Sequence, residues 1–432
     1  MRRKSLALAI SLALLPAALA HAEEAAEELI ITGVRTHTPL QLITDPKRPR
    51  QPMPAHDGAD YLKTIPGFSV VRKGGTDGDP ILRGMAGSRL SMLIDGDLIL
   101  GGCNNRMDPP TAYVFPETFD SIRVIKGPQS VQYGPGNSAG VVLFERTPQT
   151  VEEPEWKLHS SVLAGSFGRH DEVVDLQYRS PHWDVRGSAS NSASSNFEDG
   201  DGTEVHSSFE RWNTQWSVAW KPDANTRLEV GTAFSDGEAA YADRGVDGSK
   251  FARENYNIKF TRDAIGPLLS SIETQAYYNY VDHVMDNYSL RSPSGMMGHP
   301  TAMNPDRSTS GGKFAVTLTP NAALSLDLGL DTQRNRHSSR NTMDQLTTPY
   351  DSLARVADSK FAQLGLFLEA DWSLDAGGRI VAGARTDRWS FTDQRQEVAL
   401  SMMSSVSNPL ADYKRDEVLH SGFMRYEGEL AG

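Results

Sequence analysis

Most of the chain after residue 155 alternates between apolar and polar side chains with a period of two. In Arg211–Trp220 the even positions carry Trp, Thr and Val, whereas the odd positions carry Arg, Asn, Gln, Ser and Ala. This period is typical of a β-strand with one apolar face. The pattern predicts twelve strands, at about residues 156–166, 172–179, 183–190, 211–220, 227–234, 254–262, 268–286, 311–319, 324–331, 360–372, 378–390 and 418–430.

The connections between these strands alternate in length. Tight turns follow the even-numbered strands, and long polar loops, such as 191–210 and 287–310, follow the odd-numbered strands beyond the first. Short turns at one end and long loops at the other are typical of an outer-membrane β-barrel, in which a closed sheet pairs every backbone group. Aromatic strand ends such as Trp212 and Trp220 favour the membrane. The alternative is a large secreted β-sandwich or propeller.

The first 22 residues have the pattern of a secretory signal peptide: a basic start, an apolar stretch from Leu6 to Ala20, and small residues before Glu23. No other segment has eighteen consecutive apolar residues, and mean hydropathy is -0.44, so we expect no transmembrane helix in the mature chain. We interpret residues 23–54 as a mobile periplasmic arm, 55–150 as a compact mixed α/β domain, and 155–432 as the barrel segment.

The chain is acidic, with a formal net charge of -12, and loss of the basic signal makes it more negative. This charge argues against nucleic acid as a partner, because phosphate binding needs a basic face. It is compatible with cations. The chain has no phosphate-binding G-x-x-x-x-G-K-[ST], no H-E-x-x-H, and no G-x-S-x-G between a strand and a helix. The sequence therefore does not predict an enzyme.

Four glycine-containing motifs precede the strand-rich region in a fixed order: RGMAGSR at 83–89, MLIDG at 92–96, IRVIKGPQSVQYG at 122–134 and SAGVV at 138–142. Together they resemble the plug domain of TonB-dependent outer-membrane receptors. That resemblance implies an all-β transmembrane barrel with an N-terminal mixed α/β plug in its lumen, an outer-membrane location in a Gram-negative cell, and energised uptake of a bound substrate.

The arm contains the stretch ELIITG, which resembles a TonB box. The implied box residues are Glu28, Leu29, Ile30, Ile31 and Thr32. A short β-prone segment can add as a strand to the sheet edge of a partner. The predicted partner is TonB with its inner-membrane energising complex; the alternative for this segment is an ordinary edge strand.

The number of strands departs from the family pattern. Plugged transporters of this kind resemble 22-stranded barrels, whereas only about twelve strands are predicted here. We therefore expect the chain to be either a fragment of a longer receptor or a truncated product.

Cys103 is the only cysteine, and Met107 follows it four residues later in GCNNRM. In an oxidising compartment a lone cysteine is a buried apolar residue, an intermolecular partner or a ligand. Thiolate and thioether are soft ligands that favour Cu(I). The i, i+4 spacing suits one helical turn or a tight loop around a single ion.

His283 and Met285 lie two residues apart in the seventh predicted strand, on its polar, lumen-facing side. They follow the turn near Gly266 by more residues than a membrane strand needs, so we expect them near the outer vestibule. The Cys103 segment resembles the apical plug loops that face this vestibule in TonB-dependent receptors, and this resemblance allows Cys103, Met107, His283 and Met285 to converge between plug and barrel. The C-x-x-x-M and H-x-M pair resembles the arrangement in TonB-dependent copper receptors, which implies copper import. In the alternative, His283 is a wall residue and Met107 packs the plug.

One loop holds further donors that suit either metal capture or ordinary loop packing: Met296, Met297, His299 and Met303. Two other functions remain open. One is an iron-siderophore receptor, although Fe(III) chelates are usually held by aromatic and basic side chains. The other is a non-transporting surface receptor or adhesin.

Overall fold

The computed structural model describes residues 36–38, 40–294, 298–374, 377–401 and 404–428. The predicted signal peptide, the predicted TonB box at Glu28–Thr32, and Met296 and Met297 lie outside these residues. None of the helices in the described ranges is long and apolar enough to cross a membrane.

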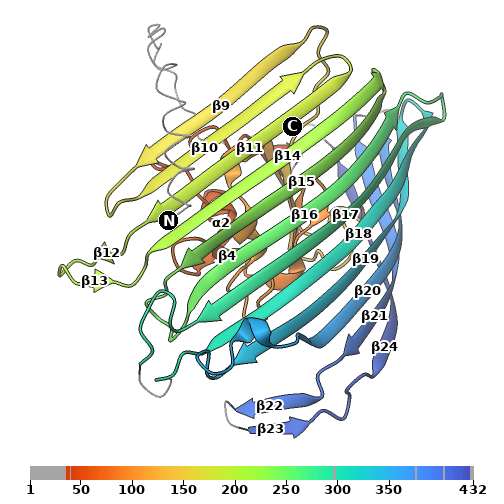
Figure 1. Cartoon of the computed structure of the whole chain (residues 1–432). Coiled ribbons are helices and arrows are strands. Elements are labelled where there is room, and N and C mark those ends of the chain that lie inside the picture. Colours follow the sequence, from red (N-terminus) through yellow and green to blue (C-terminus); the bar gives the residue numbers. More distant parts are fainter. Residues whose placement is uncertain (1–35, 39, 295–297, 375–376, 402–403, 429–432) are drawn as a thin grey trace, which may run out of the picture. The chain divides into compact units, whose positions relative to one another are not determined.

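A curved sheet of twelve antiparallel strands forms the larger part of the structure (Figure 1). Each strand pairs with its neighbour in sequence, apart from two small hairpins that project from long connections. The sheet strands are β9 (Glu155–Ala164), β10 (His170–Arg179), β11 (Trp183–Ser194), β14 (Phe209–Asp223), β15 (Thr226–Ala239), β16 (Asp247–Asp263), β17 (Leu269–Asp286), β18 (Ala302–Asn321), β19 (Leu324–Thr342), β20 (Val356–Ser373), β21 (Arg379–Asp393) and β24 (Lys414–Glu427). The hairpins are β12 (Phe197–Glu198) with β13 (Glu204–Val205), and β22 (Glu397–Ser401) with β23 (Ser404–Ser407). The twelve-stranded prediction is confirmed.

The two faces of the sheet differ as the alternation predicted. In β14, Trp216 is 56% exposed, whereas Arg211 on the other set of positions is 5% exposed. In β17, Tyr278 is exposed, whereas Asn279 and His283 are buried. The set predicted to face the lumen is therefore the set that the N-terminal domain covers.

Several strands extend further into the long connections than predicted. β18 begins at Ala302 rather than near residue 311, and β19 continues to Thr342 rather than ending near residue 331. Residues 303–310 read MNPDRSTS, so both faces are largely polar and the alternation is lost. The ladder hydrogen bonds persist because they depend on the backbone and not on the side-chain pattern.

The N-terminal domain contains a six-stranded mixed sheet in the order β1, β2, β7, β8, β5, β6, and β5 and β8 are parallel. A small hairpin, β3 with β4, packs beside it. The elements are β1 (Thr36–Thr38), β2 (Gln41–Thr44), α2 (Gly58–Leu62), β3 (Phe68–Arg72), β4 (Gly78–Leu82), η1 (Gly87–Arg89), β5 (Leu90–Ile94), β6 (Asp97–Leu98), η2 (Pro110–Tyr113), η3 (Pro116–Thr118), β7 (Ser121–Lys126) and β8 (Gly140–Glu145). A further short 3-10 helix, η5 (Tyr350–Ser352), lies between β19 and β20.

The segment interpreted as an arm contributes to this sheet. β2 pairs with β7, and Leu42 is 2% exposed. Burial of Leu42 in the domain core stabilises this segment in the sheet. The polar composition of residues 23–54 did not predict this. The mobile-arm interpretation is therefore wrong for β2, and the ordered sheet begins before residue 55.

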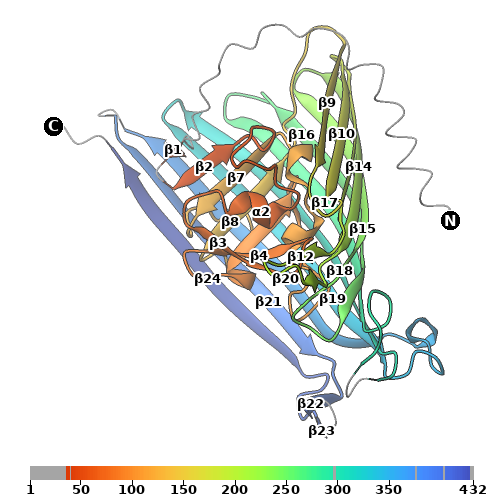
Figure 2. The same cartoon turned by 90° about the vertical axis from the view of Figure 1, so that its left-hand side faces the viewer.

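The N-terminal domain lies against the concave face of the large sheet (Figure 2). Charged clusters hold one part of the interface: Arg186 of β11 pairs with Asp120 at 2.8 Å, and Lys47 pairs with Asp175 of β10 at 3.1 Å. Neutral amides hold another part, because Gln275 of β17 donates to Asp97 at 2.6 Å. These contacts bring the loop that follows β6 to the face of β17.

Candidate metal centre

The loop after β6 makes a tight turn around the lone cysteine. The Arg106 amide donates to the Cys103 carbonyl oxygen at 3.0 Å, and Arg106 has a φ of 53°. The Arg106 guanidinium binds both carboxylate oxygens of Asp79 in β4 at 2.7 Å. The spacing from Cys103 to Met107 thus corresponds to the tight-loop alternative and not to a helical turn.

Asp108 closes this loop from inside. One carboxylate oxygen accepts from the Gly102 amide at 2.6 Å and the Tyr113 hydroxyl at 2.8 Å, and the other accepts from the Cys103 amide at 2.8 Å. The backbone is so close that a Cβ at Gly101 would lie 1.9 Å from the Asp108 carbonyl oxygen. With three donors on its two oxygens, Asp108 supports the loop.

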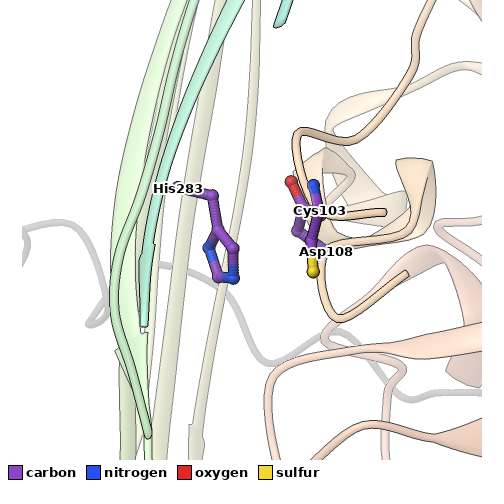
Figure 3. Close-up of side chains that lie close together, drawn as sticks. All are labelled: Cys103, Asp108 and His283. Atoms are coloured by element: carbon purple, nitrogen blue, oxygen red, sulfur yellow. The ribbon is translucent and has the colours of Figure 1, made fainter. Parts of the chain in front are cut away.

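His283 faces the loop from the large sheet (Figure 3). Its Nδ1 lies 2.8 Å from the Lys250 carbonyl oxygen, which accepts only if Nδ1 carries the proton. Its Nε2 is buried and has no hydrogen-bond partner within the described part of the chain. The tautomer set by Lys250 therefore leaves the Nε2 lone pair available to a ligand.

Ligand atoms of Cys103, Asp108 and His283 all lie within 4.8 Å of one another. Met107 and Met285 are 2% and 3% exposed and belong to the same buried cluster as Cys103. The structure thus brings Cys103 and His283 together and buries both thioether side chains in the surrounding core. Asp108, which the sequence analysis did not treat as a candidate ligand, is the third member of the close group.

The site is apolar around its polar atoms. The Phe251 ring lies 4.5 Å from the His283 ring, centroid to centroid, and Val281 and Tyr241 are buried in the same cluster. Burial, and secondarily the negative charge of Asp108, raise the pKa of the Cys103 thiol. Without a metal ion the sulfur therefore retains its proton at neutral pH, and a bound soft metal ion would displace it.

Met303 and His299, the described members of the predicted capture group, are more exposed than the residues around Cys103. Met303 is directly opposite Met285 in the β17–β18 ladder and is 46% exposed. Residues opposite each other in an antiparallel ladder share one face of the sheet. His299 is exposed, and its carbonyl oxygen accepts from the Asn287 side chain at 3.1 Å.

Two residues near the site escaped the sequence analysis. His337 of β19 and Asp358 of β20 lie in the connection between the predicted strands 324–331 and 360–372. His337 Nε2 lies 2.6 Å from the Gly102 carbonyl oxygen, and Nδ1 lies 2.6 Å from the Asp358 carboxylate. Continuing the odd-numbered lumenal positions of β19 past Asp331 would have placed His337 on the inner face.

Two family descriptions match the chain. Residues 36–141 match "TonB-dependent Receptor Plug Domain", and residues 163–426 match "TonB dependent receptor-like, beta-barrel". The chain belongs to the TonB-dependent receptors. This family consists of outer-membrane receptors and transporters and is not a class of enzymes. The six-stranded domain is the plug, and the twelve-stranded sheet is barrel wall.

Similar solved structures share this architecture. A structure named copper transporter OprC is 44% identical with a TM-score of 0.88, and the match covers 93% of this chain and 62% of OprC. The ferric citrate transporter FecA is 14% identical with a TM-score of 0.68, covering 90% and 60%. The FrpB iron transporter from Neisseria meningitidis is 14% identical with a TM-score of 0.65, covering 87% and 59%. The last two show the fold alone.

A curated relative, a hemin receptor from Yersinia pestis, is 26% identical over 134 residues, which are 28% of this chain and 19% of that protein. The chain thus spans about three-fifths of the solved relatives named above and a smaller part of the hemin receptor.

Proposed function

We propose that the chain belongs to a TonB-dependent outer-membrane receptor that imports copper. The ion is held by Cys103 and His283, with Met107 and Met285 completing the set. The observation that carries this proposal is the buried Nε2 of His283, which has no hydrogen-bond partner among the described residues, on a ring with a nitrogen within 4.8 Å of the sulfur of Cys103. Buried polar atoms normally have a partner, so an orphaned ring nitrogen beside a thiol marks a ligand position.

The chemistry of the donors supports a soft ion. One thiolate, one imidazole and two thioethers select Cu(I) over harder cations. Loss of the thiol proton converts Cys103 into an anion, which offsets part of the charge of the bound ion. The apolar shell around His283 strengthens this attraction by excluding water.

The comparison with OprC supports the same substrate, because that protein is named as a copper transporter and is 44% identical. The iron-receptor alternative draws on neighbours of only 14% identity, which carry the fold and no substrate. Met303 and His299 have the exposure expected of donors that pass an ion inward, and we extend the proposal to them as capture residues.

Elemental analysis of the full chain purified in detergent tests the proposal. The parent should hold one copper per chain, and Cys103→Ala should hold none. Met424→Leu, which alters an exposed methionine of β24, is the matched control and should retain copper. Equal, negligible copper in the parent and in Cys103→Ala would overturn copper binding and restore the iron-chelate alternative.

The TonB box is tested separately. Deleting Glu28–Thr32 should abolish copper uptake by cells while leaving copper bound to the purified chain, because the box supplies force and no ligand. Uptake that survives the deletion would contradict the partnership with TonB. A surface receptor or adhesin would show no dependence on the box at all.

A further inference from the structure

A histidine–aspartate pair of the barrel wall holds the residue that precedes Cys103. His337 Nε2 lies 2.6 Å from the Gly102 carbonyl oxygen. His337 and Asp358 are joined by contacts of 2.6 Å from Nδ1 to both carboxylate oxygens. The two wall residues therefore hold the loop at the position before the cysteine.

Both ring nitrogens of His337 face oxygen atoms, a peptide carbonyl oxygen of the plug on one side and the Asp358 carboxylate on the other. His337 is 2% exposed, so its ring is buried between the wall and the plug. The pair therefore links β20 and β19 to the plug.

Gly102 is consequently held at both of its peptide groups. Its amide donates to Asp108 of the plug, and its carbonyl oxygen accepts from His337 of the wall. The loop packs against β17 here, because a Cβ added at Gly102 would lie 3.3 Å from Val281 and 3.5 Å from His283 Cβ. The position of Cys103 relative to His283 therefore depends on the bonds to Asp108 and Arg106 inside the plug and on one bond across the interface.

We propose that His337 and Asp358 form a clasp that positions Cys103 against the wall and must open when the plug moves. Its role in metal transfer rests on the proposed function, whereas its role in holding the loop does not. His337 and Asp358 are positioning residues, because they reach Cys103 through Gly102. Movement of the plug would break the wall-side bond and separate the cysteine from His283, which splits the ligand set and favours release of the ion.

The lone thiol provides a direct test without metal. Cys103 is 6% exposed and is the only cysteine, so its alkylation by N-ethylmaleimide in the detergent-purified, metal-free full chain reports on the loop alone. His337→Ala should raise the alkylation rate at least tenfold. His337→Gln, whose terminal amide can still donate to the Gly102 carbonyl oxygen, should return the rate to within threefold of the parent.

His159→Ala is the matched control. His159 of β9 contacts Glu117 of the plug at 3.3 Å, so this variant also removes a histidine–carboxylate contact between wall and plug, but far from Cys103 in sequence and on another strand. It should leave the alkylation rate within twofold of the parent. A rate for His337→Ala within twofold of the parent, or an equal increase in His159→Ala, would overturn the clasp.

This result is independent of the copper measurement. Fast alkylation of His337→Ala in a chain that never holds copper would uphold the clasp and overturn the proposed substrate. If the parent holds copper, His337→Ala should bind chelator-buffered Cu(I) roughly 10- to 100-fold more weakly, the range typical for loss of a residue that orients a ligand. Unchanged affinity together with fast alkylation would limit the clasp to holding the loop and overturn its role in positioning the ligand.

Discussion

His283 and Lys250 set the chemistry of the site through one hydrogen bond. The Lys250 carbonyl oxygen accepts from His283 Nδ1 at 2.8 Å, across the ladder between β16 and β17. This bond fixes the ring orientation and the tautomer, so that Nε2 points to the plug loop with its lone pair free. A backbone carbonyl oxygen is a common partner for the second nitrogen of a metal-binding histidine.

His283→Asn should separate the role of Nδ1 as a hydrogen-bond donor from the proposed role of Nε2 as a metal ligand. The asparagine amide can replace Nδ1 as the donor to Lys250, but nothing replaces Nε2. We expect copper affinity to fall by about 100-fold or more, since even loss of a supporting partner costs 10- to 100-fold. Competition with a Cu(I) chelator measures the change. His170→Asn, at an exposed strand end, should bind as the parent does, and a His283→Asn variant of parental affinity would contradict ligation by Nε2.

Gly101→Ala should destabilise the loop around Cys103 without replacing any proposed metal ligand. The new Cβ would lie 1.9 Å from the Asp108 carbonyl oxygen, and backbone atoms cannot move away as a flexible side chain can. We expect a loss of about 1–3 kcal/mol in the free energy of unfolding, as for other overpacked sites, together with weaker copper binding. Gly266→Ala, where no atom lies within 4 Å of the added Cβ, should match the parent in thermal unfolding. Equal unfolding midpoints for both variants would contradict the crowding.

Asp97 should make the stability of the folded chain depend on pH. Burial raises the pKa of Asp97 to about 6 from 3.8, although Asn255, Asn257 and Gln275 donate to it. A raised pKa means that the folded state favours the protonated form. The stability that Asp97 contributes is therefore complete below pH 4 and is lost as pH rises through 6, by about 3 kcal/mol.

Thermal unfolding at pH 4.5 and pH 7.5 checks this prediction. Asp97→Asn cannot ionise, so the parent should lose stability relative to this variant between the two pH values. A difference between the parent and Asp97→Asn that stays constant with pH would contradict the raised pKa.

The outer face of the sheet should behave as a lipid-facing surface. Leu366, in the middle of β20, is 55% exposed on the convex side. Leu366→Arg should destabilise the chain in lipid vesicles by about 2–4 kcal/mol, the cost of a basic residue near the bilayer midplane. Leu346→Arg is the control, because Leu346 is 80% exposed in the connection between β19 and β20. Equal unfolding midpoints for the two variants would contradict membrane contact at β20.

The sequence by itself determined the strands and their faces. A period of two is a local property, so Trp216 and Arg211 could be assigned to opposite faces without knowing which strands are neighbours. The sequence did not predict the full length of the strands where this periodicity stopped. Residues 303–310 are polar on both faces, and only the ladder to β17 and β19 shows that they continue β18. The burial of Leu42 was missed for a similar reason, because Leu40, Leu42 and Ile43 are too few apolar residues to show a period.

The sequence also identified the soft donors, because residue type alone sets whether a side chain prefers a soft ion. Cys103 and His283 are 180 positions apart, and their proximity depends on the plug docking against the concave side of the sheet. Only the tertiary structure decided that Asp108 supports the loop, that Lys250 fixes the His283 tautomer, and that His337 reaches Gly102. Each of these is a hydrogen bond with a backbone group, and the position of a backbone group in space does not depend on the identity of its own side chain.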